Sequence, residues 1–139
     1  MECEIAQHSY RIGKMSAMQQ YHLVRKLGAM IPILDDTLSR KADSGRAWVA
    51  GAAVGILGQM SDADAEAVIF TCLDVVERKD GDRWVKVHPR GGNLQYDDID
   101  ILVLFELADK VVEENLGPFF AKIHVDLQDI ANQSLPPSN

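Results

Sequence analysis

Apolar residues recur every three or four positions along much of this chain, and this spacing restricts its fold more than any other feature. The longest such series is Tyr21, Val24, Leu27, Ile31, Leu34 and Leu38. A period near 3.6 places these side chains on one face of an α-helix. Ser16 precedes the series and Gln19 follows three residues later, as in a capping box. Pro32 removes one backbone donor, so we expect one kinked helix or two abutting helices.

Two further stretches in the middle of the chain predict helices. Residues 46–60 are apolar on nearly all sides, which is typical of a central helix. Ser61 is a good N-cap for the next helix, and the acidic residues that follow it favour the positive end. We expect the buried stripe of that helix to continue to Val76, and the basic residues in 77–79 to close it.

The last third of the chain predicts two more helices. Asp97 or Asp98 is expected to cap a helix over about residues 99–115. Gly117 and Pro118 should end it, because glycine suits the left-handed cap and proline suits the first turn of a new helix. Residues 119–130 would form that new helix.

Short alternating runs predict only small hairpins beside these helices. Residues 4–14 read as two strands with a turn at His8 and Ser9, and residues 84–87 alternate with 94–96 as their return strand. We therefore predict a mainly α fold with small β-hairpins (α+β). Residues 1–133 would form a single compact helical domain of about five or six helices, and residues 134–139 a disordered tail.

The charge distribution argues against two classes of partner. The formal net charge is −7, and all of the excess lies after residue 90, where Lys110 and Lys122 are the only basic residues. A chain without a basic stripe is poorly suited to nucleic acid or to an anionic membrane surface. The longest uncharged run, 47–61, is shorter than a spanning helix requires. We expect a protein of the cytoplasm, with Cys3 and Cys72 as inert thiols.

No sequence motif indicates catalysis or a metal site. The four histidines are scattered, and no nucleophile motif or phosphate-binding loop is present. Asp62, Asp64 and Glu66 resemble the start of a calcium loop, but the positions that need glycine and glutamate hold other residues. The acidic residues in 97–100 either cap a helix or hold a cation. We expect no enzyme and no cofactor.

Gly51 and Gly55 lie four positions apart with Ala47 on the same helical face. Small residues in a row allow a second backbone to approach closely. Because the run is too short to span a bilayer, we expect these glycines at a helix crossing in the core.

Both ends of the chain resemble a known family. Residues 10–15 (YRIGKM) lead into residues 16–27 (SAMQQYHLVRKL), and residues 111–120 read VVEENLGPFF. These segments resemble the opening and closing segments of bacteriophage tail assembly chaperones, which are encoded beside the tape measure protein of long-tailed phages.

The resemblance implies a non-enzymatic, mostly helical protein that binds the hydrophobic, helical tape measure protein while the tail is assembled. It implies a place in the cytoplasm of the bacterial host and absence from the mature virion. The alternative is a structural minor tail or tail-completion protein that stays in the virion. An isolated chaperone of this kind is expected to form a homo-oligomer that covers its own apolar surface.

Four side chains are candidates for binding the partner: Met18, Met30, Phe119 and Phe120. Methionine adapts to irregular apolar partners, although each one also suits an ordinary core. Phe119 and Phe120 are consecutive on a helix and point about 100° apart, so we expect one ring in the core and the other at least partly exposed.

Overall fold

The computed structural model describes residues 1–28, 54–89 and 93–134, and of residues 120, 121 and 123–134 only the helical backbone. Four antiparallel strands form one sheet in the order β1-β2-β3-β4. Their bounds are Glu2–Ile5, His8–Ile12, Val76–Asp80 and Arg83–Lys86. The two hairpins are neighbours in the sheet because β2 pairs with β3, with Tyr10 opposite Arg78.

Both hairpins close with two-residue turns. Ala6 and Gln7 join β1 to β2 with φ angles of 52° and 69°, which is the left-handed backbone that a type I′ turn requires at both positions. Gly81 has φ 63° at the first central position of the β3–β4 turn, where an L side chain would be strained. The predicted turn at His8 and Ser9 was therefore placed two residues late, since both of these residues belong to β2.

Helices α1 and α4 begin as the sequence predicts. In α1 (Ala17–Leu27) the Ser16 side chain accepts a hydrogen bond from the Gln19 backbone and the Gln19 side chain accepts one from the Ser16 backbone, so the capping box is complete. In α4 (Asp62–Leu73) Ser61 caps the Asp64 backbone N–H. Residues 54–57 form one helical turn ahead of α4.

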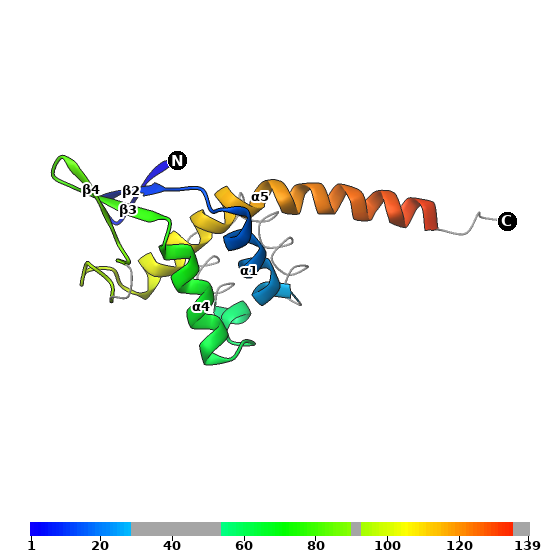
Figure 1. Cartoon of the computed structure of the whole chain (residues 1–139), viewed down its shortest axis with the longest axis horizontal. Helices are drawn as coiled ribbons and strands as arrows, with labels where there is room; N and C mark the ends of the chain where they lie inside the picture. Colours follow the sequence, from blue (N-terminus) through cyan, green and yellow to red (C-terminus); the bar gives the residue numbers. More distant parts are fainter. Residues whose placement is uncertain (29–53, 90–92, 135–139) are drawn as a thin grey trace.

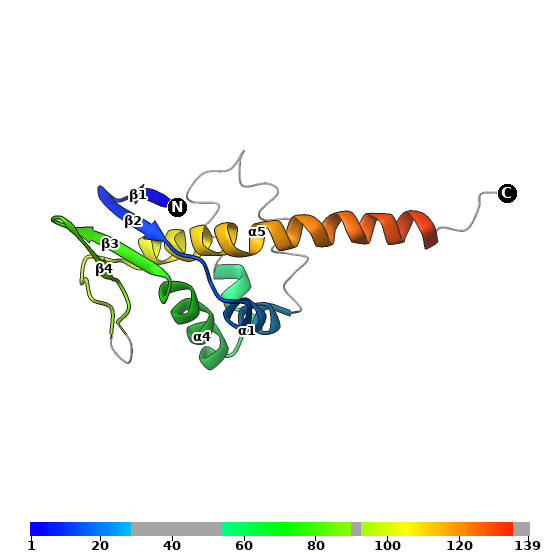
Figure 2. The same ribbon diagram turned by 45° about the horizontal axis from the view of Figure 1, so that its top comes forward.

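Helix α5 (Ile101–Ser134) is 34 residues long and runs through Pro118. The Asp100 side chain caps it by accepting from the Val103 backbone N–H at 2.9 Å. At 1.5 Å per residue it is about 50 Å long. Figures 1 and 2 show the sheet at one end, α1 and α4 against the first half of α5, and the second half extending beyond both helices.

The core forms where one face of the sheet, α4 and the first half of α5 meet. Along the strands, the residues that point to the inner face of the sheet are buried. Along α5, the buried residues recur at intervals of three and four positions. The largest fully buried side chains are Tyr10, Ile12, Leu23, Leu73, Leu107 and Leu116. The opposite face of the sheet carries charged residues and Trp84, over whose ring the Arg11 guanidinium lies at 4.7 Å.

The prediction of a mainly α fold with five or six helices is wrong. The described residues contain a four-stranded sheet, the helices α1, α4 and α5, and the helical turn at 54–57. One expected element changed type, and two expected helices are joined into one. Residues 76–80 are strand β3 where a helix end was predicted, and residues 101–134 are one helix where two were predicted. Ser134 belongs to that helix, and residues 135–139 lie outside the described part of the chain.

The structure also bears on the predicted helix crossing at the glycines and on the predicted second hairpin. Gly55 is exposed, and a Cβ added to it would meet no atom within 4 Å, so the prediction that it lies at a helix crossing in the core is wrong. Gly51, Met30 and the Pro32 kink lie outside the described residues. Strand β4 covers residues 83–86 where 84–87 was predicted. Its partner is β3, and the predicted return strand contributes only the backbone hydrogen bond that Gln95 donates to Val87.

Candidate functional site

A groove between α1 and α5 is the candidate site. It has a volume of about 260 Å³ and is open to solvent. Its walls are almost entirely apolar and are formed by Ala17, Gln20, Tyr21, Val24, Leu116 and Phe119. The four α1 residues are spaced at three, one and three positions, so one helical face supplies one wall. Leu116 and Phe119 supply the other wall from consecutive turns of α5.

Asn115 fixes the spacing of the two helices at this groove. It is 7% exposed, and its side-chain oxygen accepts a hydrogen bond from the Met15 backbone N–H at 2.7 Å. Its Nδ2 donates to the carbonyls of Gly13 and Val111. The side-chain amide thus ties the segment between β2 and α1 to α5, and its loss would leave buried backbone groups without partners.

Gly13 permits this close approach. Its backbone N–H donates to the Val75 carbonyl at 2.8 Å, and an added Cβ would lie 3.1 Å from that same oxygen. A larger residue would therefore push the segment away from its neighbour. The segment between β2 and α1 is therefore held by Val75 on one side and by Asn115 on the other.

Pro118 lies at the groove, between the two wall residues of α5. Proline has no N–H, so the helical hydrogen bond to the carbonyl four residues earlier is missing at this turn. The next carbonyl, that of Asn115, accepts from the Gln20 side-chain amide at 3.2 Å. The helix therefore continues through Pro118 with a side chain of α1 attached to the same turn.

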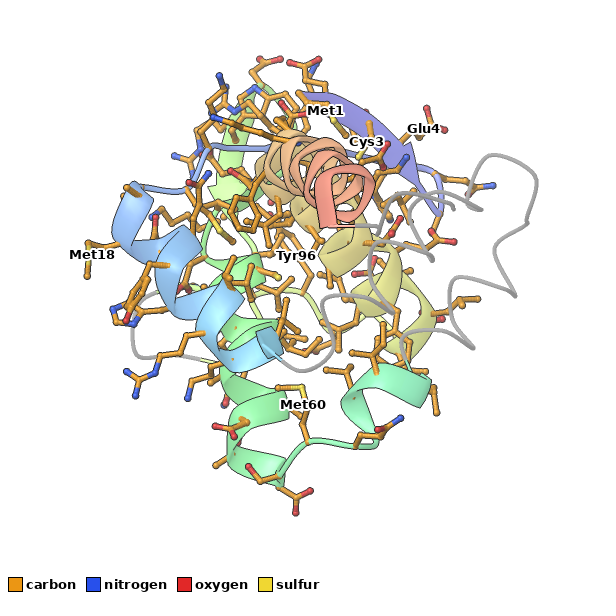
Figure 3. The ribbon with its side chains drawn as sticks, turned by 90° about the vertical axis from the view of Figure 1, so that its right-hand side faces the viewer. Met1, Cys3, Glu4, Met18, Met60 and Tyr96 are labelled. Atoms are coloured by element: carbon orange, nitrogen blue, oxygen red, sulfur yellow. The ribbon has the colours of Figure 1, made fainter. Side chains whose placement is uncertain are left out.

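The structure brings two of the predicted binding residues to this region. Phe119 lines the groove and is 39% exposed, and Met18 is 61% exposed on α1, next to the groove residue Ala17. Figure 3 shows the Met18 side chain pointing away from the body of the protein. The side chain of Phe120 and the whole of Met30 lie outside what the structure describes, so the expectation that one ring of the Phe119–Phe120 pair is buried stays a prediction.

Tyr21 and Val24 are groove residues that the sequence placed on the apolar face of an amphipathic helix. Tyr21 is in fact 54% exposed, and the fully buried side chains of α1 are Leu23 and Leu27. The apolar face of α1 is wider than the surface that α4 and α5 cover. A broad apolar face with an aromatic residue at its margin was the signal in the sequence that could have indicated the groove.

The other end of α5 is fastened by charged groups. Arg78 on β3 is 8% exposed, and its guanidinium makes two hydrogen bonds to the Asp98 carboxylate, at 2.7 and 2.9 Å. His8 lies 3.2 Å from the same carboxylate, and the Tyr96 ring lies under the guanidinium. The hydrogen bonds that Arg78 donates to Asp98 hold the pKa of the Asp98 carboxyl below its usual value, and the same hydrogen bonds raise the pKa of Arg78.

The described residues contain no arrangement typical of a metal site, since no three of their His, Cys, Asp or Glu side chains are grouped to hold an ion. Asp98 binds Arg78 and Asp100 caps α5, so both carboxylates already have structural roles. Burial raises the pKa of the Cys72 thiol to about 12, which keeps it protonated at neutral pH. Within the described part, no helix is long and apolar enough to cross a membrane.

The groove, an apolar surface between two helices with no reactive group in its walls, is characteristic of a protein that binds other proteins. A family model described as phage tail assembly chaperone protein (TAC) matches residues 6–128. The match covers most of the chain, and the protein therefore belongs to the phage tail assembly chaperone family, as its terminal segments predicted. No curated protein and no solved structure matches this sequence.

Proposed function

We propose that this protein is a non-enzymatic chaperone that binds the tape measure protein in the host cytoplasm while the phage tail is assembled. Family membership supports a role in tail assembly and an interaction with tail proteins. The observation that carries the finer proposal is the apolar groove between α1 and α5, with Met18, Tyr21 and Phe119 exposed around it. A tape measure protein is expected to be long, helical and hydrophobic, and such a helix fits a groove of this kind.

The binding surface in this proposal contains Met18, Phe119, Phe120 and Met30. Large apolar side chains at a solvent-exposed site are costly unless a partner covers them, and aromatic anchors contribute most to interface energies. Met18 and Phe119 meet this description, because both side chains are exposed in the structure. Phe120 and Met30 are included on the sequence argument alone.

Co-expression with the tape measure protein of the same phage tests the proposal. The measurement is the fraction of tape measure protein that stays soluble with the wild-type chain, with Met18→Ser or with Phe119→Ser. Ile101→Ser is the matched control, because Ile101 is 67% exposed and lies 18 residues, or about 27 Å, along α5 from Phe119. We expect both groove variants to lower the soluble fraction and the control to leave it unchanged.

Self-association is part of the same proposal. A free chaperone with exposed apolar surface is expected to cover it with a second copy, and closed symmetric oligomers are the usual form. Light scattering should give a mass above the 15.4 kDa of one chain. A strict monomer at high concentration would contradict this part.

Mass spectrometry of purified particles distinguishes the proposed role from the alternative, which is a structural component that stays in the virion. We expect the chain to be missing from mature particles. Its presence there in stoichiometric amounts would favour a minor tail or tail-completion protein.

A further inference from the structure

We propose that the α1–α5 groove selects an amphipathic helix whose apolar stripe enters the groove and whose flanking carboxylates face Arg25. This inference rests on the proposed function, and it specifies the chemistry of the partner segment that the site would accept. It follows from the size of the groove, from the row of residues along its α1 rim and from the charge of that rim.

The size of the groove suits side chains of a helix better than a small molecule. Its volume of about 260 Å³ is below the range of roughly 300–1,000 Å³ that is typical of small-molecule sites. The groove is open, and its walls run along two helices. A third helix laid along such a groove buries apolar residues at intervals of three and four positions, which is the usual way that a helix binds in a groove.

The α1 rim of the groove presents a row of exposed side chains. Met18, Tyr21 and Arg25 are spaced at three and four positions, so they lie on one face of α1, and all three are exposed. Tyr21 also lines the groove itself. A helix bound in the groove would therefore meet the apolar residues first and the Arg25 guanidinium at its margin.

The charged residues on the α1 side of the groove are all basic. Helix α1 has no acidic residue, and Lys26 already pairs with Asp64 of α4 at 3.0 Å. Among the described residues no hydrogen bond or ion pair engages Arg25. An exposed guanidinium at the margin of an apolar groove favours a partner with carboxylates next to its apolar stripe, because complementary charges raise the association rate and fix the register.

Two synthetic helical peptides test the charge preference. They share one leucine stripe and differ only in flanking residues, which are glutamate in one and lysine in the other. Fluorescence anisotropy measures the Kd of each for the full-length protein at low salt. We expect the glutamate peptide to bind about two- to fivefold more tightly, the range for an exposed ion pair. The difference should shrink as salt is added.

Single-residue variants test which side chains produce the preference for the glutamate peptide. Arg25→Gln should remove the preference for the glutamate peptide, whereas Arg83→Gln, the same change on the exposed end of β4, should keep it. Tyr21→Ser should weaken both peptides by about tenfold or more, as is common for an aromatic anchor. Circular dichroism checks that each variant is folded.

Four results would overturn the inference. The first is equal or tighter binding of the lysine peptide, and the second is an unchanged preference in Arg25→Gln. The third is displacement of the glutamate peptide by a peptide of residues 119–134 of this chain at lower concentration, which would make a second copy the occupant. If neither synthetic peptide binds but the tape measure protein is still kept soluble, the inference fails while the proposed function stands.

Discussion

The two ends of the packed half of α5 are held to the rest of the protein in different ways. At the sheet end, Leu107 and Val111 are fully buried, and the Arg78–Asp98 pair fastens the segment that precedes the helix. At the groove end, Leu116 is buried but Phe119, one turn later, is 39% exposed. The same helix thus completes the core at one end and leaves apolar surface open at the other. We therefore expect stability to depend mainly on the sheet end, and the groove end is the proposed binding surface.

The largest expected effect is on stability at the sheet end. Leu107→Ala removes a side chain with no exposed surface and leaves a cavity, which should lower the free energy of unfolding by about 2–5 kcal/mol. Ile101→Ala is the control on the same helix, and it should change stability by about 0.5 kcal/mol or less because Ile101 is mostly exposed. Urea unfolding measures both. Similar losses in the two variants would contradict the comparison.

Asn115 should have the next largest effect, because it ties the segment between β2 and α1 to α5. Asn115→Ala leaves the Met15 N–H and the Gly13 carbonyl without their side-chain partner, and this should cost about 1–3 kcal/mol. The exposed Asn93→Ala is the matched control. Thermal unfolding measures the two variants, and a small shift for Asn115→Ala would show that water replaces the amide.

The charged pair at the sheet end predicts a pH dependence. Arg78 lowers the pKa of Asp98 below its unfolded value of about 3.9, so the pair stabilises the fold above that pH. This contribution is lost as the pH falls through the lower pKa of the folded state. Asp98→Asn should therefore lower the Tm at neutral pH and flatten its decline below about pH 4. Asp82→Asn, in the β3–β4 turn, should do neither.

The smallest effect on stability is expected at the groove end. Phe119→Ser should cost about 1 kcal/mol or less, because the ring is already partly exposed in the folded protein. The same variant should lose the ability to keep the tape measure protein soluble. A loss of stability as large as that of Leu107→Ala would place Phe119 in the core and end the distinction between the two regions.

The starts of α1 and α4 were predictable from the sequence, because they depend on neighbouring residues. The start of α5 was predicted wrongly, since Asp100 caps it and not Asp97 or Asp98. Ser16 with Gln19 and Ser61 with Asp64 make the capping contacts that their spacing predicts. The N-terminal hairpin was also predicted, but not its turn. Ala6 and Gln7 adopt left-handed backbone without the asparagine or glycine that usually signals it.

The errors in the fold come from contacts between distant residues. Strand β3 was missed because Arg78 occupies an inward-facing position where an apolar residue was expected, and its burial depends on Asp98, twenty residues later. The continuous α5 was missed because Pro118 normally ends or kinks a helix. Here Gln20 of α1 bonds the adjacent carbonyl, and no pattern within α5 contains that information.

The candidate site was predicted only in part for the same reason. Met18 and Phe119 were among the four candidate binding residues, and both are exposed, but the sequence did not decide which ring of the Phe119–Phe120 pair would be the exposed one. The groove itself depends on how α1 meets α5, which is set by the hydrogen bonds of Asn115 to a segment one hundred residues earlier. Tyr21 was placed on the apolar face of a helix, but its periodic position does not show whether another element covers it or whether it lies at an exposed margin.

The bond between Met15 and Asn115 also has a consequence for the order in which the protein is made. The β1–β2 hairpin leaves the ribosome early, but β3 and the Asn115 side chain that complete its surroundings are synthesised much later. At about 5–20 residues per second, the hairpin waits roughly 5–20 s for Asn115. During that interval its inner face, with Tyr10 and Ile12, lacks the strand and helix that later cover it. A newly made chain is therefore at risk of aggregation during that interval. This is the same risk from which the protein is proposed to protect its partner.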